Sequence, residues 1–289
     1  MSNSTPGDVL VNPRRCLMFV PGSRPERYAK AIATGADQVC IDLEDAVAPG
    51  DKDSARASVF AFLADAPESY SEIGLRLNPL STELGRKDLA ELKASGLAPA
   101  FVMLPKVETV QELLDADAVL AGTDTGLIAQ IETPLGLLDA RELARATPRL
   151  QALMFGGFDF IVALRGRASW ESFFHPRVQL AVIAAEAGIG CIDVPYLDIK
   201  DEAGMVDETD RVIALGFTAK AAIHPAQVDP IQQRYLPTVS ELERAKRVVA
   251  ALQANRGEAI QLDGKLVDRP IEIAAERAIA LGVHGARPD

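Results

Sequence analysis

The chain has 289 residues, of which 48% are hydrophobic and 25% charged, and this composition predicts a soluble globular protein rather than a disordered one. Its 41 acidic and 30 basic side chains give a formal net charge of -11, which argues against a nucleic-acid partner because such a surface repels phosphate groups. The 3 cysteines are far apart, which argues against a disulfide framework and predicts a reducing, cytoplasmic location.

Apolar runs of strand length recur along the chain. The runs Cys16–Val20 and Leu127–Ile131 are continuous rather than alternating, which indicates strands buried on both faces, as in a parallel sheet covered by helices. We predict strands at Arg15–Val20, Gln38–Leu43, Ile73–Asn78, Ala100–Pro105, Gly126–Ile131, Leu150–Phe155, Gly190–Val194 and Thr218–Ile223.

Amphipathic stretches of helix length lie between these strands. Glycine follows several of them, where the end of a helix needs a left-handed residue. Thr109 and Glu112 have the spacing of a capping box. We predict helices at Arg24–Thr34, Asp51–Leu63, Leu84–Ala94, Thr109–Val119, Leu137–Ala146, Pro176–Ala187 and Glu202–Leu215.

Strands that alternate with helices in this number predict an α/β protein, a TIM (β/α)8 barrel over residues 14–236. A doubly wound open sheet is the alternative, but the chain has no dinucleotide fingerprint. We interpret residues 237–289 as a C-terminal extension that packs on a neighbouring subunit. Its predicted parts are a helix at Ser240–Asn255, a hairpin-like piece at Ala259–Val267 and a helix at Pro270–Leu281.

Several kinds of site and location are excluded by what the sequence lacks. It has no P-loop, no His-Glu-x-x-His and no Gly-x-Ser-x-Gly, and its 3 histidines are too few for a histidine-rich metal site. The charge-free run between Lys93 and Lys106 is shorter than the ~18 apolar residues that suggest a membrane span. The polar start, Met1–Asp8, has no apolar signal-peptide core. We therefore expect no membrane association.

Acidic side chains follow several of the predicted strands. Glu132 comes directly after the fifth strand and Asp159 shortly after the sixth, and small or turn residues beside both leave room for a ligand. In this fold the C-terminal ends of the strands carry the chemistry. Carboxylates without cysteine or abundant histidine suit Mg²⁺, with Mn²⁺ as a substitute. We predict Glu132 and Asp159 as metal ligands; the structural alternative is that each caps the next helix.

Arg76 lies between two leucines in the third predicted strand, so alternation turns it towards the interior or the mouth of the barrel. It needs an anion there, because an unpaired buried charge is costly. One role is a structural ion pair; the other is binding of a substrate carboxylate or a developing oxyanion. Glu44 and Asp45 are candidates for the partner in that ion pair or for positioning metal-bound water. Lys106, after the fourth strand, could complement the negative charges of the mouth, but we predict it to be a solvated residue of the rim.

The sequence resembles the citrate lyase beta-subunit-like branch of the HpcH/HpaI aldolase superfamily, which includes malyl-CoA and citramalyl-CoA lyases. The resemblance covers nearly the whole chain, and the order of its segments is specific although each segment alone is weak. The segments are FVPGSRPER (19–27), IDLEDAVAPGDKDSAR (41–56), LRLN (75–78), LPKVE (104–108), IETPLG (131–136), MFGGFDF (154–160), LGFTAKAAIHPAQV (215–228) and LVDRPIEIAAERA (266–278).

This resemblance implies roles for five residues. Mg²⁺ would be held by Glu132 and Asp159, and Arg76 would act in catalysis and, together with Glu132, in substrate binding. Arg24 is the candidate for contact with the CoA phosphates. Asp268 would reach the active site of an adjacent subunit, in a homotrimer or hexamer. In relatives an acidic stretch of small residues commonly follows the metal aspartate, whereas this chain continues as Phe-Ile-Val-Ala-Leu-Arg-Gly-Arg.

The implied function is a Mg²⁺-dependent carbon–carbon lyase. It would cleave a 3-hydroxyacyl-CoA of the malyl-, citramalyl- or citryl-CoA type to a 2-oxoacid and an acyl-CoA, with Asp268 exchanging a proton with the acyl-CoA carbon. Two alternatives stay open: a class II pyruvate-type aldolase that acts on free hydroxy-oxo acids, and a non-catalytic subunit of a larger lyase complex.

Overall fold

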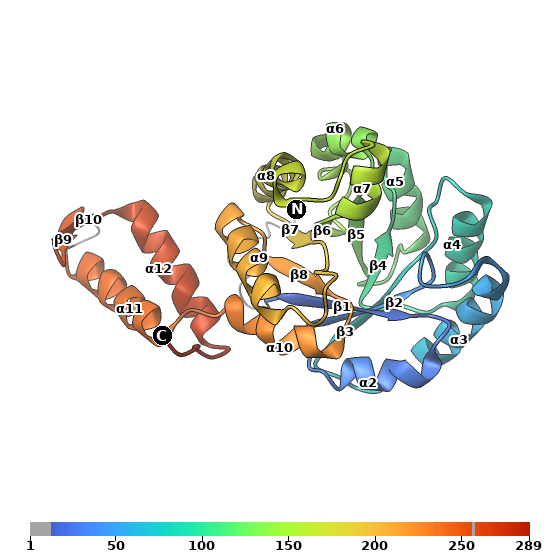
Figure 1. Ribbon diagram of the computed structural model, residues 1–289, viewed down its shortest axis with the longest axis horizontal. Helices are drawn as coiled ribbons and strands as arrows, with labels where there is room; N and C mark the ends of the chain where they lie inside the picture. The colour runs from blue at the N-terminus through green and yellow to red at the C-terminus, as the bar shows by residue number, and fades with distance from the viewer. Residues whose placement is uncertain (1–12, 256–257) are drawn as a thin grey trace. The chain divides into compact units, whose positions relative to one another are not determined.

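The computed structural model describes residues 13–255 and 258–289, and its main feature is a closed barrel of parallel strands (Figure 1). Neighbouring strands follow the order of the chain, and β1 pairs with β8 to close the barrel, which confirms the predicted (β/α)8 fold. The strands are β1 (Cys16–Pro21), β2 (Gln38–Asp42), β3 (Glu72–Arg76), β4 (Phe101–Leu104), β5 (Gly126–Ile131), β6 (Leu150–Phe155), β7 (Gly190–Asp193) and β8 (Ala219–Ala222).

Helices separate the strands and surround the barrel in Figure 1. The predicted capping box at the start of α5 is present, because Thr109 and Glu112 each bond the other's backbone N–H. The helices up to the end of the barrel are α2 (Tyr28–Ile32), α3 (Lys52–Ala64), α4 (Glu83–Ser95), α5 (Val110–Val119), α6 (Pro134–Leu143), α7 (Gly157–Ala163), α8 (Trp170–Ala187), α9 (Glu202–Leu215) and α10 (Pro225–Arg234).

The segment after β6 differs from the prediction. The short helix α7 lies where only a loop is expected, and it carries Asp159 in its first turn. The helix α8 begins at Trp170 rather than at Pro176, because the Ser169 hydroxyl accepts a hydrogen bond from the Ser172 N–H (3.2 Å) and so caps an earlier start. Pro176 therefore lies inside the helix.

Apolar side chains fill the inside of the barrel. Strand β3 contributes Gly74 to this interior, where an added Cβ would lie 2.4 Å from the carbonyl oxygen of Phe101 and 2.6 Å from its ring. The glycine therefore leaves the space that the Phe101 ring occupies. The buried residues of this core are Leu17, Cys40, Phe101, Met103, Ile128, Ala152, Met154, Ile192, Ala219 and Ala221.

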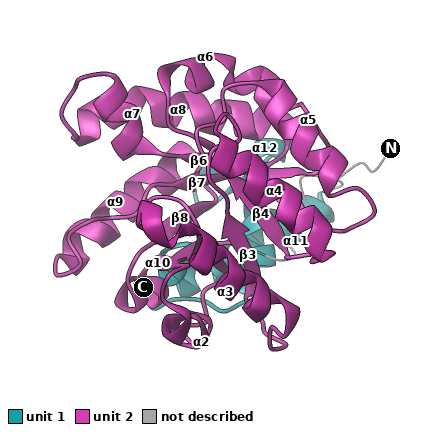
Figure 2. Ribbon diagram, turned by 90° about the vertical axis from the view of Figure 1, so that its right-hand side faces the viewer, with its two compact units in different colours: residues 1–13, 232–289 teal, residues 14–231 magenta. Residues whose placement is uncertain are grey.

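The chain divides into two compact units, which Figure 2 distinguishes by colour. One is Arg14–Ile231, with the barrel, and the other includes Gln232–Asp289. In the second, the helices α11 (Val239–Ala254) and α12 (Arg269–Gly282) pack with the antiparallel hairpin of β9 (Ile260–Leu262) and β10 (Lys265–Val267). This unit has its own apolar cluster, made of Ala245, Val248, Leu252, Val267 and Ala275. Within the described ranges, no helix is both long enough and apolar enough to cross a membrane.

Candidate active site

A pocket of about 350 Å³ lies at the C-terminal ends of the barrel strands. The ends of β1, β2, β3, β5 and β6 and the segments after β7 and β8 contribute to its lining. Three residues predicted for the site line it together, namely Arg76, Glu132 and Asp159. The fold therefore brings side chains from three distant parts of the sequence to one end of the barrel, because the ends of parallel strands converge there.

Glu132 follows β5 and is buried, with an exposed fraction of 1%. Its Oε1 accepts a hydrogen bond from the backbone N–H of Lys106 (2.8 Å), and its Oε2 accepts one from Gln130 Nε2 (2.8 Å). Burial and the negative charges of nearby carboxylates raise the pKa of Glu132 to about 8. The helix-cap alternative is wrong for this residue, since the Thr133 hydroxyl caps α6 by accepting from the Gly136 N–H (3.0 Å).

Asp159 projects from the first turn of α7, and its side chain is about half exposed. It is not the N-cap of that helix, because Gly156 occupies the cap position. The Asp159 carboxylate has Lys106 Nζ at 3.9 Å and faces the same pocket as Glu132. One buried and one accessible carboxylate thus share the mouth of the barrel.

This donor set fits Mg²⁺. Magnesium prefers oxygen ligands, commonly takes one or two protein carboxylates and keeps several waters. In the part of the chain that the structure describes, no group of three or more His, Cys, Asp or Glu residues encloses a metal site. Glu132 and Asp159 would therefore hold the ion at an open position, where water and substrate oxygens complete its coordination.

Gly156 makes room for the Glu132 carboxylate. A Cβ at this position would lie 2.3 Å from Glu132 Cβ and 2.6 Å from its Oε2, although the glycine has an ordinary φ of -96°.

We expect Gly156→Ala to displace Glu132, to weaken Mg²⁺ binding by roughly tenfold or more, and to cost about 1–3 kcal/mol of stability through overpacking. Calorimetric Mg²⁺ titration and thermal unfolding measure the two effects. Gly50→Ala, in open space, is the matched control, and unchanged Mg²⁺ affinity in Gly156→Ala would contradict the assignment.

Arg76 is buried and lines this pocket with its charge paired. Its Nε and Nη2 donate to the two oxygens of Asp42 (2.7 and 2.6 Å), which lies opposite in the β2–β3 register. The Arg76 Nη1 lies 2.9 Å from Glu44 Oε2 and donates a hydrogen bond to Gln130 Oε1 (3.3 Å). The Arg76 Cζ lies 5.0 Å from the centre of the Phe19 ring. Burial lowers the pKa of Arg76, but the adjacent carboxylates outweigh it and raise the pKa.

The predicted pairing of Arg76 with Glu44 is therefore present, whereas the pairing with Asp42 was not predicted. The Arg76 guanidinium has N–H groups beyond those that donate to Asp42 and Gln130. Its ion pairs therefore do not prevent it from contacting a ligand. Burial raises the pKa of Asp42, but its charged hydrogen bonds with Arg76 bring that pKa below the ordinary value. The carboxylate is thus a permanent anchor for the guanidinium.

Lys106 lies among the carboxylates, so the prediction of a solvated rim residue is wrong. Its ammonium donates to Glu44 and lies 3.8 Å from Asp45 Oδ2 and 3.9 Å from Asp159 Oδ2. Its φ of 52° is left-handed, which is uncommon for a residue other than glycine, and its N–H is the donor to Glu132. The four acidic residues expected at the same mouth were the available signal that a lysine after β4 would be drawn inwards.

A second lysine holds the loop after β2 in place. Lys52 Nζ donates to two carbonyl oxygens of that loop (2.8 and 2.5 Å) and to Asn78 Oδ1 (2.9 Å). The Asn78 amide in turn donates to buried Asp88 (2.6 Å), which also accepts from Arg56 Nε (2.6 Å). This network positions the loop that carries Glu44, and no local sequence pattern predicted it.

The acidic residue at the end of β7 lies in a separate network of buried charges. Asp193 at the end of β7 is fully buried and accepts from Arg177 Nε (2.8 Å) and Lys220 Nζ (2.7 Å). Glu208 completes this network by accepting from Lys220 Nζ (2.8 Å). The four charges balance and connect the helices α8 and α9 to the strands β7 and β8, so Asp193 does not belong to the pocket.

Two predicted residues lie outside the lining of the pocket. Arg24, after β1, has a side chain that is 53% exposed and only a distant ion pair with Glu26 (3.7 Å). Asp268 precedes α12 in the other unit, and its side chain makes no hydrogen bond that caps this helix. Within residues 13–255 and 258–289, neither the Asp268 carboxylate nor the Arg24 guanidinium is therefore committed to a strong local contact.

Comparison with known proteins agrees with this geometry. Residues 15–225 match the sequence profile of the HpcH/HpaI aldolase/citrate lyase family. Citrate lyase subunit beta of Escherichia coli K12 is 35% identical to this chain in sequence, with 89% of each chain covered. The mitochondrial citramalyl-CoA lyase of Homo sapiens is 31% identical to it, with 93% of this chain and 85% of the relative covered.

The crystal structure of Mycobacterium tuberculosis CitE in complex with magnesium, acetoacetate and coenzyme A is similar over 94% of this chain and 99% of that one. The TM-score is 0.80 and the sequence identity 31%. The fold and the family profile therefore agree. The chain belongs to the HpcH/HpaI aldolase/citrate lyase family and is a carbon–carbon lyase.

Proposed function

We propose that this protein cleaves a 3-hydroxyacyl-CoA whose carbinol carbon also bears a carboxylate, in a Mg²⁺-dependent reaction. The bond between that carbon and the acyl α-carbon breaks, the hydroxyl proton leaves, and the α-carbon receives a proton. The products are a 2-oxoacid and an acyl-CoA, so the atoms balance without a further reactant. The observation that carries the proposal is the shared pocket of Arg76, Glu132 and Asp159.

The residues of the pocket have complementary tasks in this reaction. Bound Mg²⁺ would polarise the hydroxyl and carboxylate oxygens of the substrate and so favour loss of the hydroxyl proton. Glu132 and Asp159 would hold the ion, with Glu132 oriented by Gln130 and by the Lys106 N–H. Arg76 would stabilise negative charge that develops as the bond breaks, because its position is preorganised by buried carboxylates.

The proposal extends to a shared active site in the cytoplasm. Asp268 would come from a neighbouring copy of the chain, in a homotrimer or hexamer, and exchange the proton with the acyl α-carbon. Its lack of a capping hydrogen bond leaves the carboxylate available for this role. Arg24, which is exposed after β1, would contact the phosphates of CoA.

A cleavage assay on the isolated full-length chain tests this function. Malyl-CoA, citramalyl-CoA and citryl-CoA are supplied with Mg²⁺ or with EDTA, beside the corresponding free acids. We expect Mg²⁺-dependent release of acyl-CoA from at least one thioester. Cleavage of the free acids alone would favour the CoA-independent aldolase, and no cleavage of any compound would favour a non-catalytic subunit.

We expect Arg76→Lys to lower kcat by roughly 10²–10³-fold although the charge is kept. A lysine cannot donate to both oxygens of Asp42 while it also faces the pocket. Steady-state kinetics measure the effect. Arg15→Lys is the matched control, because Arg15 makes the same bidentate buried pair with Asp37 at the opposite ends of the strands. If the two variants had equal kcat, Arg76 would have only a structural role.

A further inference from the structure

The pocket has one wall without charge, which the proposed roles do not use. We call the side chains of Phe19, Val194, Pro195 and Ile223 the apolar wall; all four line the pocket. Val194 is buried, whereas Ile223 is 38% exposed at the end of β8. The Phe19 ring covers one side of the Arg76 guanidinium, with 5.0 Å from its centre to Cζ. A substituent that points away from the carboxylates would therefore meet carbon atoms.

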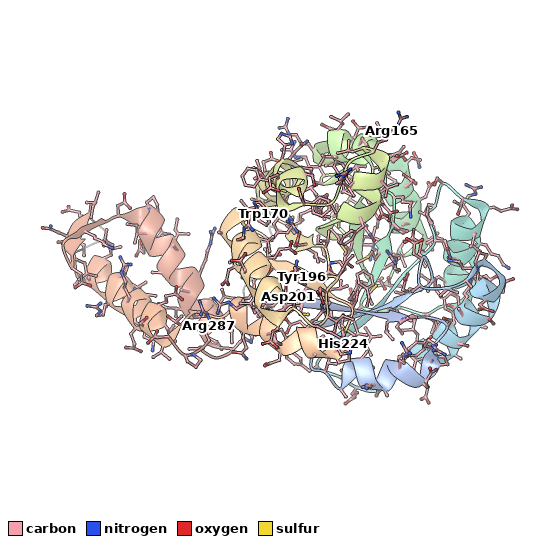
Figure 3. All side chains as sticks on the ribbon, in the orientation of Figure 1. Arg165, Trp170, Tyr196, Asp201, His224 and Arg287 are labelled. Atoms are coloured by element: carbon pink, nitrogen blue, oxygen red, sulfur yellow. The ribbon has the colours of Figure 1, made fainter. Side chains whose placement is uncertain are left out.

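The apolar wall is held firmly by hydrogen bonds. Gln227 is buried and joins two of the three segments that form the wall, since its Nε2 donates to the Tyr196 carbonyl (2.8 Å) and its Oε1 accepts from the Ile223 N–H (2.9 Å). The Tyr196 hydroxyl donates to Asp201 (2.7 Å), which adds a second anchor to the same segment (Figure 3). The wall is thus a built part of the pocket rather than a loosely placed loop.

The charges of the pocket are unfavourable for an additional carboxylate. Arg76 is the only cation among the lining residues that the structure describes, and four carboxylates line the same space, namely Asp42, Asp45, Glu132 and Asp159. Arg76 is already paired with Asp42 and Glu44. The adjacent Lys106 donates to Glu44 and has Asp45 and Asp159 near it.

One carboxylate of the substrate would bind at the metal, as the proposed function requires. A second would have to lie against the apolar wall without a cation, and burial of an unpaired carboxylate is strongly disfavoured. A methyl group in that place would gain contact with Ile223 and Val194 instead. We infer that the substrate carries a small alkyl group, not a carboxymethyl group, on its carbinol carbon, so that the 2-oxoacid product is of the pyruvate class rather than oxaloacetate. This inference rests on the proposed function.

The test compares citramalyl-CoA, which has the methyl group, with citryl-CoA, which has the carboxymethyl group. Initial rates of acyl-CoA release are measured with the full-length protein and saturating Mg²⁺. We expect kcat/KM to be at least about tenfold higher for citramalyl-CoA. Equal or higher kcat/KM for citryl-CoA would overturn the inference while leaving the proposed function intact. If citramalyl-CoA, citryl-CoA and malyl-CoA were all left uncleaved, the proposed function itself would fail.

A pair of variants tests the apolar wall directly. Ile223→Arg places a guanidinium where the structure has none, and partial exposure of this position lets it accept the longer side chain. We expect the ratio of kcat/KM for citryl-CoA over citramalyl-CoA to rise about tenfold or more, because the second carboxylate gains a partner. Ile223→Met, of similar length but uncharged, should not raise the ratio. A ratio that rises equally in both variants, or in neither, would contradict the role of the wall.

Discussion

Glu132→Gln is expected to abolish Mg²⁺ binding and to lower kcat by roughly 10³-fold or more, which corresponds to the several kcal/mol that a metal contributes to such a transition state. The amide keeps the size of the side chain and can still accept a hydrogen bond from the Lys106 N–H, but it removes a negative ligand. Calorimetric Mg²⁺ titration and steady-state kinetics measure the two losses. Asp159→Asn should act in the same direction, because it removes the second carboxylate of the pocket.

The metal-free stability of Glu132→Gln separates loss of a ligand from loss of the fold. Burial and neighbouring carboxylates disfavour the charged form of Glu132, which raises its pKa to about 8. Removal of that charge offsets the hydrogen bond from Gln130 Nε2 that the new amide nitrogen cannot accept, so the melting temperature in EDTA should stay near that of the wild type. Mg²⁺ should raise the melting temperature of the wild type but not that of the variant, because only a protein that binds the ion gains stability from it.

The matched control is Glu72→Gln at the start of β3, where the carboxylate pairs with Arg14 at the other end of the strands. Its Mg²⁺ affinity should equal that of the wild type. Unchanged Mg²⁺ affinity in both Glu132→Gln and Asp159→Asn would end the metal assignment.

Asp268→Asn is expected to lower kcat by roughly 10²–10⁴-fold, the usual contribution of a positioned proton donor, while Mg²⁺ and 2-oxoacid binding persist. The residue precedes α12, and its side chain has no capping hydrogen bond whose loss would destabilise the helix. Kinetics and Mg²⁺ titration together show whether only the chemical step is affected. Asp263→Asn is the control in the same extension, because Asp263 lies in an exposed turn where it pairs with Arg247.

Mixed oligomers test whether Asp268 acts across subunits. Co-expression of Asp268→Asn with Glu132→Gln should restore part of the activity, because some sites then combine an intact metal ligand from one chain with an intact aspartate from another. Hybrids must be verified by differential tagging. Verified hybrids without recovered activity, or a chain that is a monomer in solution, would show that the site is not shared.

Local sequence signals were sufficient for the barrel and for the placement of Arg76, Glu132 and Asp159 at its mouth. Continuously apolar strands that alternate with helices allow few folds, and the C-terminal ends of parallel strands converge at one end of a barrel. Glu132 and Asp159 follow strands, and Arg76 has an inward position within one, so their meeting in one pocket follows from chain order and alternation. The family segments at the same residues agree with this result.

The tertiary structure alone decided which charges pair and where space is left. Asp42 faces Arg76 because of the β2–β3 register, Lys106 turns inwards on a left-handed backbone, and Gly156 leaves room for Glu132. Likewise, Ile223 ends the eighth predicted strand, but only the tertiary structure shows that it lines the pocket. The physical reason is that periodicity reports which face of an element a side chain occupies. Its partners and its free space depend on residues far away in the chain, and these are set only when the strands pair and the core packs.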